Sequence, residues 1–291
     1  KRQLLNYMSA WWFNNTRHII PNHYVHHDNR HMVVKKCNPI KLEIVVRAFM
    51  TGSSSTSIWT RYNRGERNMY GIRFRDGYSK NQKLDELVIT PTTKGNVDEP
   101  ITKQEIIDRC YLTETEINYI FEKALELFKF GSLVAADRGL LLVDTKYEFG
   151  FYNNQIILMD ELHTCDSSRY WKHESYSSRF ANALEPDKYD KDCIRDYVKA
   201  TYSNQEIQTR NCFDIPENIV DNVNNVYKTY YYLLTHSNLD TADIDLKQYI
   251  YNYFNNTHSQ IAVIIAGSVS CLLYTSPSPR DAHESRMPSS A

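Results

Sequence analysis

The sequence predicts an α+β fold, because strands, a long helix, a β-hairpin and further helices follow one another along the chain. Residues 42–49 are apolar and β-branched, which is typical of a strand. Apolar side chains in residues 117–128 recur at helical spacing. Residues 140–162 then indicate two antiparallel strands, joined by a turn at Asn153-Asn154.

The first hundred residues combine a helix, short strands and a polar segment. Apolar side chains between residues 4 and 12 predict an amphipathic helix, and residues 32–34 predict a strand. Residues 53–100 are strongly polar and are expected to be loop-rich, with turns at Arg64-Gly65 and Asp76-Gly77. Histidines cluster at residues 18–31 without acidic or cysteine partners at a metal-binding spacing, so we expect a polar loop and strand edge there.

Capping residues predict where the later helices begin and end. Capping-box sequences start at Thr102 and at Thr113, and Gly139 follows the second of these helices. Two further helices are predicted at residues 191–202 and 216–234, the second with a proline at its start.

Composition excludes several classes of protein. The 291 residues include 34 basic and 35 acidic side chains, so we do not expect a nucleic-acid binder driven by bulk charge. We also expect no membrane helix and no secretory leader, and therefore a cytoplasmic protein. The six cysteines form no C-x-x-C pair, which argues against a disulfide framework or a zinc site. The Walker loop, the G-x-G-x-x-G motif and the G-x-S-x-G motif are not found.

The predicted hairpin carries the most informative charges. Because side chains alternate along a strand, Asp144, Lys146 and Glu148 share one face. The turn brings Glu148 close to Asp160 on the second strand. Two carboxylates suit Mg²⁺, and a lysine between them suits an anionic group. A solvated charged face with cross-strand ion pairs is the alternative.

Three further segments carry groups that suit anions. The turn from Asp166 to Arg169 combines hydroxyls with a guanidinium, Arg47 precedes a turn that contains Ser53, and Lys94 lies in a polar loop. Ordinary polar turns and a solvated lysine are the alternatives. The residues alone therefore predict an α+β enzyme that handles anions with a divalent metal.

Several motifs occur in a consistent order from about residue 4 to about residue 234. They are VVRAFMTGS, SIWTRYNRGERNMYG, DGYSKNQKL, ITPTTK, LVDTKYEFG and MDELHTCDSSRYW. Together they resemble the SAICAR synthetase family, the phosphoribosylaminoimidazole-succinocarboxamide synthases of purine biosynthesis. The second and third motifs are similar to the bacterial and plant subtype of that family.

The resemblance implies a reaction and a fold. The reaction is the ATP-dependent ligation of L-aspartate to carboxyaminoimidazole ribonucleotide, which gives SAICAR, ADP and phosphate, with Mg²⁺ bound alongside ATP. The fold is a loosely kinase-like, two-lobed one, with an ATP-binding antiparallel β lobe that is incomplete here and an α+β lobe. No nucleic acid or membrane partner is implied, and a homo-oligomer is left open.

The resemblance also assigns site residues by motif. Glu148 and Asp160 are implied as metal ligands. The other residues assigned to Mg²⁺–ATP are Lys36, Cys37, Asn38, Lys94, Asp98 and Asp144. The residues assigned to the ribonucleotide or to substrate carboxylates are Arg47, Ser53, Lys146, Asp166, Ser168 and Arg169, of which Lys146 and Arg169 are implied as catalytic.

Three departures from the family pattern matter. Lys41 stands where the family usually has the proline of a Pro-x-Glu signature, and Cys165 replaces the usual proline before Asp166. Both changes affect local rigidity more than chemistry. The glycine-rich, lysine-bearing phosphate loop of the family is expected before Lys1, so we expect this chain by itself to be inactive.

The ends of the chain suggest a division into segments. We assign residues 1–236 to a SAICAR synthetase domain that lacks its N-terminal strands, and residues 237–258 to a linker helix. Residues 259–270 resemble the first strand of the AIR carboxylase family, which indicates a fused carboxylase domain. Residues 271–291 resemble translated sequencing adapter and are expected to be non-native, as in a fragment of metagenomic origin.

Other functions remain open at this point. The chain is alternatively a fragment of a bifunctional synthetase and carboxylase, or a catalytically dead nucleotide-binding module. A protein or small-molecule kinase is disfavoured, because the sequence contains neither H-R-D nor D-F-G.

Overall fold

The computed structural model describes residues 2–29, 31–54, 57–95, 98–189, 192–210, 212–236 and 261–265. Its elements, in chain order, are α1 (Arg2–Asn15), β1 (Tyr24–His27), β2 (His31–Lys35), β3 (Asn38–Pro39), β4 (Leu42–Met50), α2 (Ile58–Asn63), β5 (Asn68–Met69), β6 (Ile72–Arg73), β7 (Gln82–Thr93), α3 (Lys103–Asp108), α4 (Glu114–Ala136), β8 (Leu140–Tyr152), β9 (Gln155–Met159), β10 (Ser168–Lys172), α5 (His173–Ala181), α6 (Asp192–Thr201), α7 (Asn204–Thr209), α8 (Glu217–Thr235) and β11 (Ile261–Ile265). Helices and a largely antiparallel sheet confirm the predicted α+β class.

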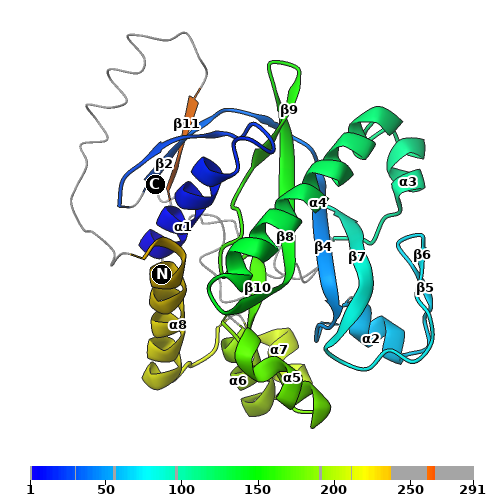
Figure 1. The fold of residues 1–291 in the computed structure, drawn as a ribbon, viewed down its shortest axis with the longest axis vertical. Helices are drawn as coiled ribbons and strands as arrows, with labels where there is room; N and C mark the ends of the chain where they lie inside the picture. The colour runs from blue at the N-terminus through cyan, green and yellow to red at the C-terminus, as the bar shows by residue number, and fades with distance from the viewer. Residues whose placement is uncertain are drawn as a thin grey trace.

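The main sheet is built around β8 (Figure 1). The first half of β8 lies between β10 and β4, and its second half lies between β9 and β3. β7 pairs with β4 and forms the outer edge. Glu148 lies opposite Met159, and Asn153 and Asn154 both have positive φ, so the predicted hairpin is confirmed.

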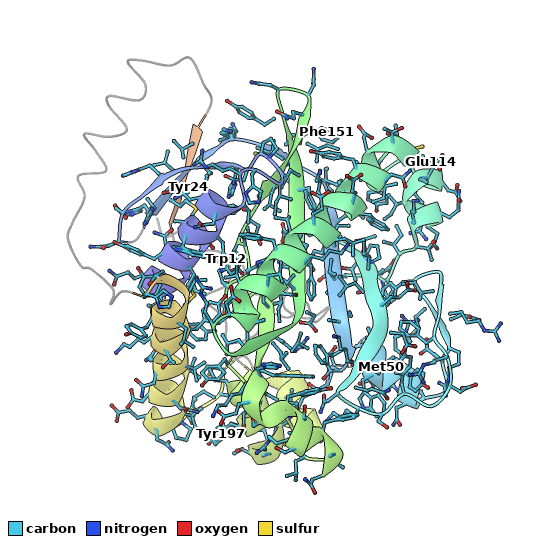
Figure 2. The ribbon with its side chains drawn as sticks, viewed as in Figure 1. Trp12, Tyr24, Met50, Glu114, Phe151 and Tyr197 are labelled. Carbon is cyan, nitrogen blue, oxygen red and sulfur yellow. The ribbon has the colours of Figure 1, made fainter. Side chains whose placement is uncertain are left out.

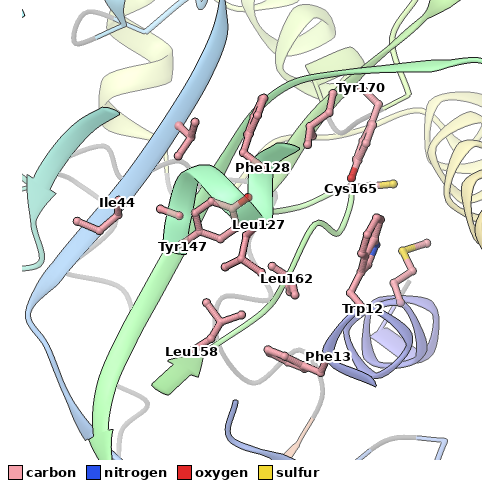
Figure 3. Close-up of a cluster of buried hydrophobic side chains, with 14 of the residues drawn as sticks. Trp12, Phe13, Ile44, Leu127, Phe128, Tyr147, Leu158, Leu162, Cys165 and Tyr170 are labelled. Atoms are coloured by element: carbon pink, nitrogen blue, oxygen red, sulfur yellow. The ribbon is translucent and has the colours of Figure 1, made fainter. Parts of the chain in front are cut away.

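One face of this sheet forms the hydrophobic core against α4, which lies across β8 and β4 (Figure 1). Val143, Thr145 and Tyr147 of β8 are all fully buried on this face. Leu127 and Phe128 of α4 pack in the same cluster (Figure 3). The strand alternation predicted for β8 is confirmed, and it leaves the charged side chains on the opposite face.

α1 closes one side of the core and contributes Trp12 and Phe13 (Figure 3). A small sheet in the order β1-β2-β11 lies beside it. Residues 261–265 pair antiparallel with β2, from Ile261 opposite Lys35 to Ile265 opposite His31. The predicted carboxylase strand, residues 259–270, thus adds to this sheet where it is described, and a separate domain stays a prediction. The predicted linker helix and adapter-like tail lie outside the described residues.

The segment predicted to be loop-rich, residues 53–100, also contains α2, β5, β6 and β7, of which β7 was not predicted. These elements surround a second, smaller core. The predicted turns are present, because Gly65 and Gly77 both have positive φ. Met50 at the end of β4, labelled in Figure 2, lies in that cluster with Tyr62 and Phe74.

The predicted helix boundaries agree closely with the structure. Both capping boxes form, with Thr102 and Thr113 at the N-caps of α3 and α4. Pro216 precedes α8 as expected. Among the described residues, no helix combines the length and apolarity that crossing a membrane requires.

The close approach of α4 to the chain after β9 gives a first testable prediction. A Cβ added at Gly131 would lie 2.2 Å from Cε1 of the His163 ring. That ring is fully buried, packs on Trp12 and bonds the Tyr147 hydroxyl at 2.6 Å, so it has no room to move. Gly131→Ala should therefore lower the free energy of unfolding by about 1–3 kcal/mol, despite the better helix propensity of alanine.

Urea denaturation of the whole chain measures this loss. Leu133→Ala, at an exposed position on the same helix, is the control and should change stability by less than about 0.5 kcal/mol. Equal stability of Gly131→Ala and the unaltered chain would contradict the packing described here.

Candidate functional site

Charged side chains gather on the face of the sheet opposite α4. Alternation along β8 places Asp144, Lys146 and Glu148 on this face. In the register of β4 with β8, Arg47 lies opposite Asp144. Glu43, two positions before the residue opposite Lys146, is therefore on the same face.

The lysine–carboxylate cluster, defined as Glu43, Lys94, Lys146, Glu148 and Asp160, occupies one half of this face. Lys146 Nζ lies 2.8 Å from Glu148 Oε1, 3.2 Å from Glu43 Oε1 and 3.5 Å from Asp160 Oδ2. Lys94, which directly follows β7, contacts the other carboxylate oxygen of Glu148. The structure thus brings together four predicted site residues and a fifth, Glu43, that was not predicted.

The pKa values of Lys146 and Glu148 are set by the charges around them, whereas that of Asp160 is set by burial. Burial alone would raise the pKa of Glu148, but the charges of Lys146 and Lys94 outweigh burial and lower the pKa to about 2. Burial would likewise lower the pKa of Lys146, but Asp160, Glu148 and Glu43 hold it well above its usual value. For Asp160, burial prevails over the attraction of Lys146 and raises the pKa. Lys146 is therefore a fixed positive charge and Glu148 a fixed negative one.

The cluster fits a magnesium ion held partly by a substrate. Among the described residues, no group of three or more His, Cys, Asp or Glu side chains is arranged to hold a metal ion by itself. Mg²⁺ usually takes one or two carboxylates together with water and phosphate oxygens. Glu148 and Asp160, which meet at Lys146, provide donors of that kind.

The arginine–aspartate triad, defined as Arg47, Asp144 and Arg169, occupies the other half of the face. Asp144 Oδ2 lies 2.6 Å from one Arg169 nitrogen and 3.3 Å from one Arg47 nitrogen. Thr90 of β7 accepts a further bond from Arg47 Nε at 2.9 Å. All three members of the triad are largely buried. One carboxylate faces two guanidiniums, so the triad carries a net positive charge that suits an anion.

The two groups lie along one strand. Asp144 and Glu148 are four residues apart on β8, which corresponds to roughly 13 Å. A molecule with a cation-bound anionic group at one end and a second anionic group at the other, or two such molecules that react with each other, can therefore contact both groups at once.

The segment after β9 and the start of β10 carry two more predicted residues, Asp166 and Ser168. Asp166 accepts a hydrogen bond from the Tyr227 hydroxyl of α8 at 2.5 Å. Ser168 does not reach the charged face: its hydroxyl donates to Thr145 Oγ1 at 2.7 Å, on the core side of the sheet. Because Ser168 and Arg169 are neighbours on a strand, their side chains point to opposite faces. A substrate contact through the Ser168 side chain is thus not supported.

The other predicted residues lie around the cluster or away from it. Burial raises the pKa of Asp98, although the charges of Lys146 and Lys94 act in the opposite direction. Asn38 pairs with Phe151 of β8, near the hairpin end, and Lys36 and Cys37 precede it. Ser53 is exposed beyond β4, where its carbonyl oxygen accepts a bond from Lys199, and no described contact joins its side chain to the triad.

Three residues of the site were not predicted. Glu43 is recognisable only once the register between β4 and β8 is known. Tyr227 is distant in sequence from the residue that it contacts. Glu161 is affected by the charges of Asp160 and Asp166. It was not predicted because the resemblance assigned only Asp160 from this acidic pair.

Glu161 gives a prediction about pH. Burial, together with the charges of Asp160 and Asp166, raises the pKa of Glu161 from 4.5 to about 7. A raised carboxyl pKa favours the folded state at low pH, and this contribution is lost as the pH rises from 4.5 through 7. Glu161→Gln should therefore be more stable than the unaltered chain at pH 8, by up to roughly 3 kcal/mol, with the gain vanishing near pH 4.5.

The measurement is the free energy of unfolding by urea from pH 4.5 to pH 8. Glu105→Gln is the control of opposite sign, because backbone and side-chain bonds from Thr102 lower the pKa of Glu105. It should become less stable than the unaltered chain as the pH rises. A Glu161→Gln chain whose stability follows that of the unaltered chain at every pH would contradict the raised pKa.

Comparisons with known proteins agree with the motifs. Residues 1–211 match the family model described as SAICAR synthetase. The chain is 49% identical over 203 residues to the chloroplastic phosphoribosylaminoimidazole-succinocarboxamide synthase of Vigna aconitifolia, covering 69% of this chain and 60% of that protein. It is 47% identical over 198 residues to the synthase of Legionella pneumophila strain Lens, covering 67% of this chain and 64% of that protein.

A solved structure supports the same relationship. The SAICAR synthase of Saccharomyces cerevisiae complexed with SAICAR aligns with a TM-score of 0.68 at 28% sequence identity, covering 82% of each chain. The curated relatives are longer, since the chain spans only 49% to 64% of the first three that it matches.

Proposed function

This chain belongs to the SAICAR synthetase family, and on that premise we propose that it serves the ATP-dependent ligation of L-aspartate to carboxyaminoimidazole ribonucleotide. The products are SAICAR, ADP and phosphate. One observation carries the proposal: a cluster suited to a cation and a triad suited to an anion lie on the same strand, roughly 13 Å apart. The yeast relative, which is complexed with SAICAR, supports the substrate class.

The lysine–carboxylate cluster is assigned to ATP. Glu148 and Asp160 would hold Mg²⁺, which neutralises charge on the phosphates when it is bound. Lys94 contacts Glu148 directly after β7, so its ammonium group is placed to bind the phosphates of ATP. Asp98 and the segment of Lys36, Cys37 and Asn38 stay proposals for the rest of the nucleotide.

The arginine–aspartate triad is assigned to the ribonucleotide. Arg47 and Arg169 offer planar, two-pronged donors to a phosphate or carboxylate. Asp144, which the resemblance assigned to Mg²⁺–ATP, contacts both arginines, so we assign it to this group instead. Lys146 lies between the triad and Glu148 on β8. Because its carboxylate neighbours keep it protonated, it acts as a positive charge and not as a base.

The proposed chemistry requires no nucleophile from the protein. An oxygen of the ribonucleotide carboxylate attacks the γ-phosphorus of ATP, and ADP leaves. The aspartate amine then attacks the acyl phosphate carbon, phosphate departs, and the amine loses a proton. Lys146 and Arg169 orient the reacting groups and stabilise the negative charge that develops on them.

Separate titrations of the 291-residue chain test this function. Calorimetry with carboxyaminoimidazole ribonucleotide, and with ATP in the presence of Mg²⁺, should show one site for each ligand. Because the chain by itself is expected to be inactive, ligand binding and not product formation decides the test. If neither ligand binds, the proposal is wrong. Formation of SAICAR from both ligands and aspartate would contradict the expected inactivity and would exclude the binding-only module.

The remaining assignments are expectations of the same proposal. A cytoplasmic location is one of them, and the Vigna relative is chloroplastic. A homo-oligomer and a fused AIR carboxylase domain are the others.

A further inference from the structure

Helix α8 lies beyond residues 1–211, which match the family model. It nevertheless contacts the segment between β9 and β10, which contains the predicted substrate residue Asp166. The Tyr227 hydroxyl donates to Asp166 Oδ1 at 2.5 Å. One turn later, the Tyr230 hydroxyl lies 2.9 Å from the carbonyl oxygen of His163. Two tyrosines of one helix thus contact the segment between β9 and β10, directly before the strand from which Arg169 reaches the triad.

The position of α8 is itself fixed. Tyr227, Tyr230 and Leu234 are spaced at three and four residues, so they share one face of the helix, and all are buried. Trp12 of α1 donates its indole N–H to the Tyr230 hydroxyl at 3.3 Å. α8 packs against α1 (Figure 1). The two hydroxyls are therefore held at defined points instead of sampling many rotamers.

The Tyr230 contact continues into the core of the segment. The hydroxyls of Tyr230 and Tyr170 lie 2.8 Å apart, and Tyr170 donates to the same His163 carbonyl at 2.8 Å. His163 has positive φ, an unusual conformation for a residue other than glycine, and its carbonyl needs these partners. Tyr230 and Tyr170 therefore fix the backbone at His163. Tyr227, in contrast, contacts a side chain, the carboxylate of Asp166.

The Asp166 carboxylate needs such a partner. It is half-buried, and the Tyr227 hydroxyl lies 2.5 Å from its Oδ1 atom. A hydroxyl donor bonded to one carboxylate oxygen stabilises the ionised form and selects one orientation of the group.

We propose that Tyr227 is a positioning residue for the ribonucleotide site, because it orients the Asp166 carboxylate three residues before Arg169. This inference rests on the proposed function, in which Asp166 and Arg169 contact the ribonucleotide. In this role Tyr227 acts on the ribonucleotide through the Asp166 carboxylate. Part of the substrate site thus depends on a helix beyond residues 1–211, the range that the family model matches.

The test is Tyr227→Phe in the full 291-residue chain, with Tyr231→Phe as the matched control. Tyr231 is buried on the same helix, but its ring faces Tyr7 of α1 and not the segment. Calorimetry should show that Tyr227→Phe raises the Kd for carboxyaminoimidazole ribonucleotide about tenfold, the expected effect of losing a bond to a charged acceptor. The Kd for Mg²⁺–ATP should stay unchanged, and Tyr231→Phe should change neither.

A double-mutant cycle separates positioning from a general loss of structure. Once Asp166→Ala has removed the carboxylate, Tyr227→Phe should weaken ribonucleotide binding no further. Amide hydrogen exchange at residues 161–168 should also become faster in Tyr227→Phe, while exchange in α4 stays the same.

The outcomes distinguish this inference from the proposed function. If the unaltered chain binds the ribonucleotide and Tyr227→Phe binds it equally well, the inference is wrong and the proposed function stands. Equal weakening for both ligands would reduce Tyr227 to a structural role and also overturn the inference. If the unaltered chain binds no ribonucleotide, the proposed function fails, and the positioning role fails with it.

Discussion

Glu148→Gln is expected to weaken the magnesium-dependent binding of ATP by about 100-fold or more, the upper range seen when groups around a metal are altered. Glu148 is only 3% exposed, and both of its carboxylate oxygens contact lysines. Glutamine keeps the shape of the side chain but removes the charge that a metal ion needs. The fold should survive, because Lys146 keeps Glu43 and Asp160 as partners.

Calorimetric titration of ATP with and without Mg²⁺ measures this effect, and circular dichroism checks the fold. Glu43→Gln is the informative comparison, because it removes a different buried carboxylate from the same lysine. Its binding of ATP should still depend on Mg²⁺. If Glu148→Gln binds Mg²⁺–ATP as tightly as the unaltered chain, Glu148 is a partner of the lysines and not a metal ligand.

The parts of the fold that were predicted correctly have local causes. The alternation of β8, the turn at Asn153-Asn154 and the capping boxes at Thr102 and Thr113 each depend on residues within a few positions of one another. Side-chain period and cap chemistry are therefore sufficient to identify them.

β7 was missed because its pattern is not that of a half-buried strand. Lys83, Asp85 and Glu86 are exposed in its first half, and Pro91 interrupts its second half. Proline is tolerated there because β7 is the edge of the sheet, so the missing N–H breaks no ladder to a further strand. Whether a strand is central or at an edge is decided by the whole sheet, and a single segment does not carry that information.

The site residues likewise divide into those with a local cause, which were predicted, and those brought together by tertiary contacts, which were not. The charged face of β8 follows from alternation, so Asp144, Lys146 and Glu148 were predicted together. The contact between Glu43 and Lys146 depends on the register of two strands about a hundred residues apart in sequence, and the Tyr227–Asp166 bond depends on how α8 docks. Pairings of this kind are tertiary, and periodicity within one segment does not contain them.

Asp144→Asn is expected to lower the free energy of unfolding by roughly 3–5 kcal/mol, the cost of breaking a buried ion pair on one side. Asp144 is 5% exposed, and one of its oxygens faces nitrogens of both Arg47 and Arg169. Asparagine fills the same space without the charge, so two buried guanidiniums lose their common counter-ion. Urea denaturation of the full chain measures the loss.

The surface pair Arg75–Asp85 provides a control of matched geometry. Arg75 Nε lies 2.7 Å from Asp85 Oδ2, close to the 2.6 Å between Arg169 and Asp144, but both side chains are largely exposed. Asp85→Asn should therefore cost far less, since water screens exposed charges, and equal losses in the two variants would contradict the role of burial. The two uncompensated arginines should also attract anions, so inorganic phosphate should raise the Tm of Asp144→Asn more than that of the unaltered chain. If phosphate raises neither Tm, the triad is a structural ion pair and not the anion site from which the proposed function proceeds.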